Sequence, residues 1–295
     1  MICAVISVLC SLFFSAALTH AAPPPSALFV VLGGFHSCTP TGNGDELNLY
    51  ESKIWHAYST TLLPAATTEL GTSPQMIAGC FGTPNLASPH SELAFRFAEV
   101  GVPPKQINLG SSWQDLTELR MAPVLSLLTE SILKITHENR SIPVYIIGHS
   151  YGGWTAMRLV SQLLENHPEI HSSLRALYTI DPISPLHCSP STFISAAIES
   201  IPGCQRAPSD ISGDERIFIR DHLQGRWLNF YETQFHRLHS SRMPELEEDK
   251  QSFKIRLEYT NPIFNDAHNL ISKDRRIWAM LSKTVLKDLA ELRQH

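Results

Sequence analysis

Ser150 lies in a sequence pattern that can turn a serine hydroxyl into a nucleophile. The run VYIIGHSYGGW at residues 144–154 joins an apolar, strand-like segment to a helix-like one through a Gly-x-Ser-x-Gly motif. A serine raised on so sharp a turn has a strained backbone, and Gly148 and Gly152 leave the room that the turn needs. The N-terminus of the following helix favours negative charge nearby. The pattern therefore predicts that Ser150 attacks a carbonyl carbon and forms a covalent intermediate.

The Gly-His-Ser-Tyr-Gly-Gly sequence at 148–153 resembles the nucleophile elbow of the α/β-hydrolase family, in particular of its secreted lipase and esterase branches. The resemblance is specific at the elbow, and the order of the expected elements extends it over most of the chain. It implies a mostly parallel sheet flanked by helices and a triad in the order Ser…Asp/Glu…His. It also implies hydrolysis of carboxylic esters without a metal or an organic cofactor.

The predicted general base is His268. A serine hydroxyl is a poor nucleophile at neutral pH and needs a base within hydrogen-bonding reach. His268 falls in the loop expected between a strand at 253–259 and the C-terminal helix, which is where the family carries its base. His236 and His239 are the alternatives, but they follow Tyr231 without a further strand-to-loop pattern.

The predicted acid of the triad is Asp181. It ends the strand expected at 174–180, at the carboxyl end where ligands bind in open α/β sheets. The surrounding Ile-Asp-Pro-Ile-Ser-Pro segment resembles the Leu-Asp-Pro-Ala-x-Pro segment that holds the triad aspartate of pancreatic-type lipases. Glu232, one strand later, is the alternative acid. Asp266 is too close to His268 in sequence to orient its ring from behind.

Two backbone N–H groups are expected to stabilise the oxyanion that develops on the substrate. One is that of Tyr151, immediately after the nucleophile. The other belongs to the turn after the first apolar strand, where Gly33-Gly34-Phe35 is similar to the family's His-Gly-x turn with glycine in place of histidine. By that match Phe35 supplies the N–H and Gly34 lets the backbone approach, although the missing histidine leaves the choice between the two open.

The first 22 residues predict a signal peptide. Residues 1–18 carry no charged side chain, and small residues follow before the proline run at 23–25. The mature chain is then 23–295, a single domain that is secreted or periplasmic. An uncleaved anchor helix is the alternative.

Four cysteines lie beyond residue 22, which suits an oxidising compartment. They allow three pairings, of which we favour Cys188–Cys204, within one Pro/Ser-rich stretch, together with Cys38–Cys80. None has CxxC spacing, so a zinc site has little support.

Alternating strands and helices predict an α/β fold built on a parallel sheet. The strands are expected at 27–32, 75–79, 143–147, 174–180, 226–231 and 253–259, and the helices at 49–63, 91–99, 113–137, 154–165 and 276–292. Pro123 is expected to kink or divide the third helix. The segment 182–226 is interpreted as an insertion that covers the site as a lid.

The charge balance argues against a nucleic-acid partner. With 23 Lys and Arg against 28 Asp and Glu, the net charge is -5, and no basic stripe is present. The expected partner is a small-molecule or lipid ester, with transient contact to a lipid interface. Thioesterase or amidase action by the same triad is one alternative function, and a non-catalytic binding protein on a hydrolase scaffold is another.

Overall fold

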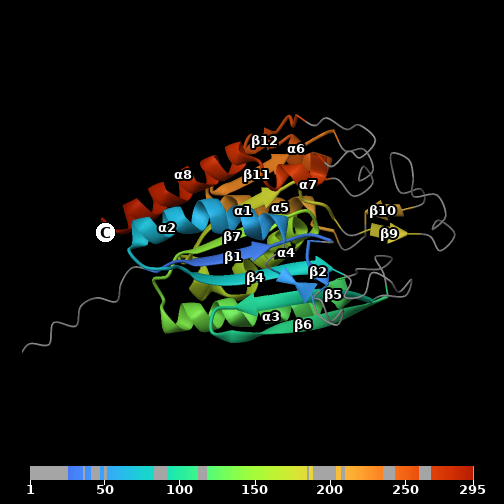
Figure 1. The fold of residues 1–295 in the computed structure, drawn as a ribbon. Coiled ribbons are helices and arrows are strands. Elements are labelled where there is room, and N and C mark those ends of the chain that lie inside the picture. The colour runs from blue at the N-terminus through green and yellow to red at the C-terminus, as the bar shows by residue number, and fades with distance from the viewer. Residues whose placement is uncertain are drawn as a thin grey trace, which may run out of the picture.

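The protein is built around a mostly parallel β-sheet with helices on both faces (Figure 1). A computed structural model describes residues 26–35, 37–40, 47–49, 52–82, 92–111, 118–184, 186–188, 204–206, 210–234, 243–258 and 267–294. The expected signal peptide at 1–22 lies outside these residues. Among them, no helix has the length and apolar character needed to cross a bilayer.

Eight strands form the main sheet of the described chain, and five of their seven pairings are parallel. In spatial order they are β12 (Ser252–Lys254), β11 (Trp227–Tyr231), β8 (Leu174–Ile180), β7 (Val144–His149), β1 (Leu28–Leu32), β4 (Gln75–Gly82), β5 (Glu92–Glu99) and β6 (Val102–Ser111). The pairings β4–β5 and β5–β6 are antiparallel. Two short antiparallel pairs stand outside this sheet: β2 (Thr39–Pro40) with β3 (Leu47–Asn48), and β9 (Leu186–Cys188) with β10 (Cys204–Arg206).

The helices divide between the two faces of the sheet. On one face lie α3 (Glu118–Glu138), α4 (Tyr151–Asn166) and α5 (Gly213–Leu223). The other face carries α1 (Lys53–Ala57), the π-helix η2 (Tyr58–Leu62), α2 (Leu63–Leu70), α7 (Ala267–Ile271) and α8 (Arg275–Leu292). A 3-10 turn, η3 (Pro168–Ile170), follows α4, and the short α6 (Pro244–Glu247) precedes β12.

The continuous apolar runs of the sequence form strands that are buried on both faces. In β1, Leu28, Val30 and Leu32 pack into the core under α3 and α4. Phe29 and Val31 face the opposite core, under α1 and α8. An uninterrupted run of β-formers is what a central parallel strand between two helical layers requires.

The segment 92–99 is a strand, so the prediction of a helix there was wrong. Leu93, Phe95 and Phe97 point into the core beside α3, while Ala94 and Ala98 point to the other side of the sheet. This period of two decides the structure, although Glu, Leu and Ala are good helix formers. The following strand β6, which the sequence analysis missed, contains two prolines, and these are tolerated because β6 is an edge strand.

The other expected elements are confirmed with shifted ends. The helix expected at 49–63 begins after its N-cap Ser52 and continues through η2 and α2 to Leu70. Pro123 lies inside α3, which passes through it as one helix, so the expected division is wrong. The last strand ends at Lys254 rather than at 259.

The segment 182–226 contains more than an insertion. Its last part, α5, packs on α4 and belongs to the helical layer: Ile219 and Leu223 enter the main core, and Arg158 forms an ion pair with Glu215 at 2.5 Å. Figure 1 shows β9 and β10 apart from this layer, beyond the end of the sheet toward which β1 points.

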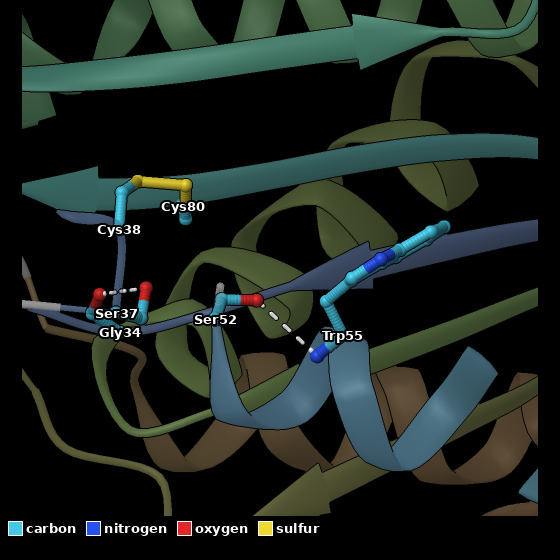
Figure 2. The surroundings of a disulfide bond; sticks show 6 residues. All are labelled: Gly34, Ser37, Cys38, Ser52, Trp55 and Cys80. Atoms are coloured by element: carbon cyan, nitrogen blue, oxygen red, sulfur yellow. Dashed lines mark hydrogen bonds between the residues drawn. A yellow bond between two sulfur atoms is a disulfide. The ribbon is translucent and has the colours of Figure 1, made fainter. Parts of the chain in front are cut away.

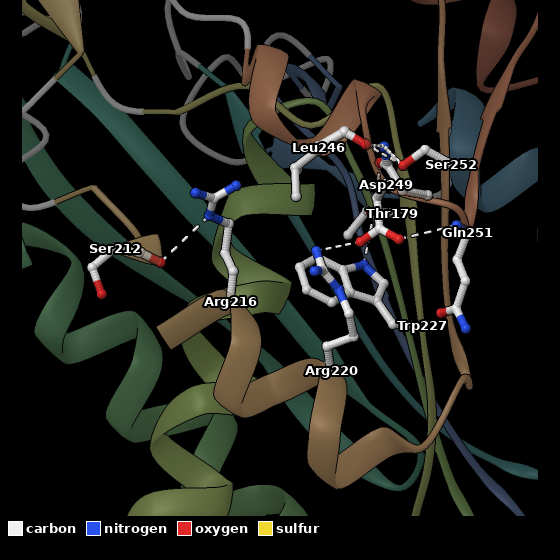
Figure 3. A network of polar contacts seen from close by, with 10 residues as sticks. Thr179, Ser212, Arg216, Arg220, Trp227, Leu246, Asp249, Gln251 and Ser252 are labelled. Atoms are coloured by element: carbon white, nitrogen blue, oxygen red, sulfur yellow. Dashed lines mark hydrogen bonds and ion pairs between the residues drawn. The ribbon is translucent and has the colours of Figure 1, made fainter. Parts of the chain in front are cut away.

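A buried polar network ties together the strands that carry the expected acids (Figure 3). Trp227 Nε1 donates to Thr179 Oγ1 at 3.1 Å, and that hydroxyl donates to Asn229 Oδ1 at 2.8 Å. Asn229 Nδ2 in turn donates to Ser252 Oγ at 3.0 Å. The network therefore fixes β8, β11 and β12 against one another just before the ends of β8 and β11. Outside this network, Arg220 of α5 forms an ion pair with Asp249.

Candidate active site

Ser150 occupies the turn between β7 and α4, as the motif predicts. Its backbone angles are φ +59° and ψ -132°, a conformation that costs energy in a non-glycine residue. Two N–H groups, those of Gly153 and Ile183, donate to its carbonyl oxygen at 2.9 and 3.1 Å. The strained turn is thus held from both sides, by the helix that follows and by the segment after β8.

The turn has no space for side chains at the two flanking glycines. A Cβ at Gly148 would lie 2.3 Å from the carbonyl oxygen of Gly152, and one at Gly152 would lie 2.4 Å from the carbonyl oxygen of Leu32. Both contacts are with backbone, which cannot move aside cheaply. The two glycines of the motif are therefore required for the steric reason expected from the sequence.

His268 and Asp181 form a buried, hydrogen-bonded pair. His268 Nδ1 lies 2.5 Å from Asp181 Oδ2, and both residues are less than a tenth exposed. The second carboxylate oxygen of Asp181 accepts the backbone N–H of Glu232 at 3.3 Å. Asp181 follows β8 in a left-handed conformation, φ +44°, with its own N–H donating to Phe230. His268 lies in the short helix α7 rather than in the expected loop.

The structure gives Asp181 and its alternative Glu232 different positions. The carboxylate of Asp181 meets the His268 ring, whereas that of Glu232 accepts the backbone N–H of Gln234. Glu232 contributes to the pair through its backbone, which holds Asp181. The competing residues His236, His239 and Asp266 lie outside the described residues.

His149 connects the His268–Asp181 pair to the nucleophile turn, and the sequence analysis gave it no role. Its ring stacks on that of His268, with centroids 4.8 Å apart and planes inclined by 29°. Its Nε2 lies 2.8 Å from the backbone oxygen of His268. Burial, together with the nearby His268 and Lys53, holds the pKa of His149 well below its ordinary value. In the described part of the chain, the hydroxyl of Ser150 itself makes no hydrogen bond.

The two N–H groups expected to bind an oxyanion lie in adjoining segments. Neither the N–H of Tyr151 nor that of Phe35 donates to an acceptor among the described residues. The Phe35 ring stacks on the Tyr151 ring, with centroids 4.5 Å apart and planes at 18°, and Phe81 contacts both rings edge-on. These aromatic contacts fix the spacing of the two segments.

A disulfide fastens the turn that contains Gly34 and Phe35 (Figure 2). Cys38 is bonded to Cys80 of β4, the second of the two pairings we favoured. Within the turn, Ser37 donates its hydroxyl and its N–H to the carbonyl oxygen of Gly34, at 2.5 and 3.2 Å. The turn is therefore tied covalently to the sheet three residues after Phe35.

The other favoured disulfide has its backbone in register. Cys188 of β9 and Cys204 of β10 are direct partners in an antiparallel pair. Their side chains lie outside the described residues, so this disulfide stays a prediction. Among the described residues no cluster of His, Cys, Asp and Glu could hold a metal ion.

A mostly parallel sheet between two helical layers, with a serine on the strained turn between a central strand and its following helix, is the α/β-hydrolase fold. The chain has this fold. The predicted fold class is thus confirmed.

The comparisons with known proteins give likenesses of fold alone. No protein-family model and no curated protein matches the chain. Est1E from Butyrivibrio proteoclasticus is 12% identical, with a TM-score of 0.37 over 90% of this chain and 91% of that chain. TT1662 from Thermus thermophilus is 12% identical, with a TM-score of 0.38 over 88% and 89% of the two chains. The esterase domain of a Rhodothermus marinus protein is 15% identical, with a TM-score of 0.31 over 90% and 89%.

Proposed function

We propose that the chain is a serine hydrolase of carboxylic esters that works through Ser150, His268 and Asp181. The observation that carries the proposal is the buried 2.5 Å contact between His268 Nδ1 and Asp181 Oδ2, beside the strained turn of Ser150. In a triad the carboxylate fixes the ring and balances the charge that the ring gains, which leaves Nε2 to act on the serine.

The proposed reaction has two halves. Ser150 Oγ attacks the ester carbon while His268 Nε2 takes its proton, and the resulting oxyanion accepts the N–H groups of Tyr151 and Phe35. The protonated His268 then gives its proton to the leaving alkoxide, and an acyl-enzyme forms. Water, deprotonated by the same nitrogen, attacks the acyl carbon and releases the acid and the serine hydroxyl. No step requires a metal or an organic cofactor.

Hydrolysis of a series of p-nitrophenyl esters, from short to long acyl chains, tests the activity. The wild-type protein should release p-nitrophenol, and Ser150→Ala should lose turnover while keeping its fold. A fully active Ser150→Ala protein would end the proposal. The acyl-length profile then gives the substrate class, a small-molecule ester or a lipid ester at an interface.

Two other functions use the same scaffold. A thioesterase or amidase would share the triad, and matched thioester and anilide substrates separate it from an esterase. A non-catalytic binding protein is disfavoured by the hydrogen-bonded His268–Asp181 pair. Such a protein would also fail to react with a fluorophosphonate probe.

We further propose that residues 1–22 are a signal peptide and that the chain is secreted or periplasmic. The support is the uncharged apolar run followed by small residues and prolines. N-terminal sequencing of exported protein should begin after Ala21 or Ala22. Intact Met1 on membrane-bound protein would instead indicate an anchor.

We propose that part of 182–226 covers the site as a lid. The support is its place in the sequence directly after Asp181, together with the β9–β10 pair beyond the end of the sheet. Replacement of 189–203 by a short glycine linker keeps α5, which packs on α4. The acyl-length preference should then change, and an unchanged preference would argue against a lid.

A further inference from the structure

His149 makes two contacts with His268 and belongs to the strand that leads into the nucleophile turn. The rings stack at 4.8 Å, and Nε2 of His149 lies 2.8 Å from the carbonyl oxygen of His268. One contact therefore holds the ring of His268 and the other holds its backbone. His149 is only 5% exposed, so water does not compete effectively for either contact.

The hydrogen bond fixes the tautomer of His149. A carbonyl oxygen can only accept, so Nε2 must carry the proton and donate it. The ring is also neutral, because burial, His268 of α7 and Lys53 of α1 all disfavour its protonated form and lower its pKa. Asp181, which directly follows β8, lies against the other side of this pair, and its carboxylate is engaged by His268 Nδ1 and by the N–H of Glu232.

A neutral ring in this place suits the chemistry of the proposed function. When His268 accepts the serine proton it becomes a cation, and a second cation stacked on it would oppose that charge. A neutral imidazole keeps the stack and the hydrogen bond without this penalty. The alignment matters because a displacement of about 1 Å at a reacting group can cost about a hundredfold in rate.

We propose that His149 is a positioning residue, which holds the general base His268 in line with Ser150 through its Nε2–H donor and its stacked ring. The proposal rests on the proposed function, in which His268 is the base. It assigns His149 no contact with the substrate.

The tautomer can be observed in the wild-type protein, without an activity assay. Two-bond ¹⁵N–¹H correlation spectra of the histidine rings, recorded between about pH 5.5 and 8, report which nitrogen carries the proton. The signals of His149 are assigned by their loss in His149→Gln. They should show the Nε2–H tautomer and stay constant over the range. An Nδ1–H tautomer, or titration within the range, would overturn the proposal.

Three substitutions separate the two contacts. His149→Ala removes both, His149→Phe keeps a stacked ring without a donor, and His149→Gln keeps a donor without a ring. We expect kcat on a p-nitrophenyl ester to fall about 10- to 100-fold in His149→Ala with KM within about twofold. His149→Gln should recover most of the loss and His149→Phe less of it, because the donor fixes the backbone of α7.

The matched control is His171, whose Nε2 lies 2.7 Å from the backbone oxygen of Leu164, away from the proposed site. His171→Ala should keep kcat within about twofold, since it removes a similar bond elsewhere. Wild-type kcat in all three His149 variants, or no difference between His149→Gln and His149→Ala, would contradict the positioning role. If Ser150→Ala is inactive and the His149 variants are normal, only this inference fails. If Ser150→Ala is active, the proposed function fails first.

Discussion

Gly34 lies directly against Ser150, although 115 residues lie between them in the chain. A Cβ at Gly34 would be 2.3 Å from the Cβ of Ser150 and 2.4 Å from its Oγ. The turn after β1 therefore closes over the nucleophile. This contact brings the backbone of Gly34 beside Ser150, where the proposed reaction would form its oxyanion.

Substitution Gly34→Ala should abolish most of the activity. Because the new methyl group overlaps Ser150, either the serine or the turn must move, and loss of one oxyanion donor alone costs about a hundredfold or more in kcat. The measurement is kcat on a p-nitrophenyl ester. Gly213→Ala is the control, since its Cβ would meet its nearest atom only at 3.6 Å. Equal rates for the two variants would contradict the role of the turn.

The two carboxylates near the end of the sheet should differ in their effect on catalysis. Asp181→Asn should lower kcat by about 10⁴-fold, because the amide no longer fixes the His268 tautomer or balances its charge. Glu232→Gln should cost less than about tenfold, since its side-chain oxygen can still accept the N–H of Gln234. A larger loss from Glu232→Gln than from Asp181→Asn would show that the acid has been assigned to the wrong strand.

The Cys38–Cys80 disulfide should stabilise the fold as well as the turn. It closes a loop with a sequence separation of 42, for which chain entropy gives about 4 kcal/mol. The double variant Cys38→Ala with Cys80→Ala should therefore unfold at a clearly lower urea concentration than the wild type. Its kcat should also fall, because the turn with Gly34 and Phe35 loses its covalent anchor. An unchanged unfolding midpoint would argue that the bond is not formed in solution.

Burial of neutral His149 predicts a pH dependence of stability. Its pKa is low in the folded protein and about 6.5 in the unfolded chain, so below about pH 6.5 the unfolded chain binds a proton that the folded protein does not. The free energy of unfolding should therefore fall, by up to about 1.4 kcal/mol per pH unit, as the pH drops from 6.5 toward 5. Above that range His149 contributes no slope.

Urea unfolding of the wild type and of His149→Gln at several pH values measures this term. The difference in unfolding free energy between the two proteins should change with pH below about 6.5 and stay constant above it. Carboxylates change the stability at lower pH. Burial raises the pKa of Asp288, for example, but hydrogen bonds from Arg175 and Tyr145 outweigh this effect and hold its pKa below the ordinary value. Parallel curves for the two proteins down to pH 5 would contradict the assignment.

The nucleophile turn could be predicted because its signals are local. The apolar strand, the glycines on either side of Ser150 and the following helix are all contained in residues 144–165. Asp181 could be placed at a strand end for the same reason. His268 was identified from its late position in the chain. A loop was expected there because the short helix α7 is too short to show an apolar periodicity.

The failures have non-local causes. The composition of β5 is typical of a helix. The segment forms a strand because β4 and β6 pair with it and because Phe95 and Phe97 pack beside α3. The proposed role of His149 depends on α7, which begins 118 positions further along the chain. No sequence pattern around Ser150 indicates that the ring of His149 will stack on the ring of His268.

The most direct test is mass spectrometry of the protein after reaction with a fluorophosphonate. We expect one phosphonyl group per molecule, located on the peptide that contains Ser150, and little labelling of His268→Ala under the same conditions. An adduct on another residue, or an unlabelled wild-type protein that is fully folded, would contradict it.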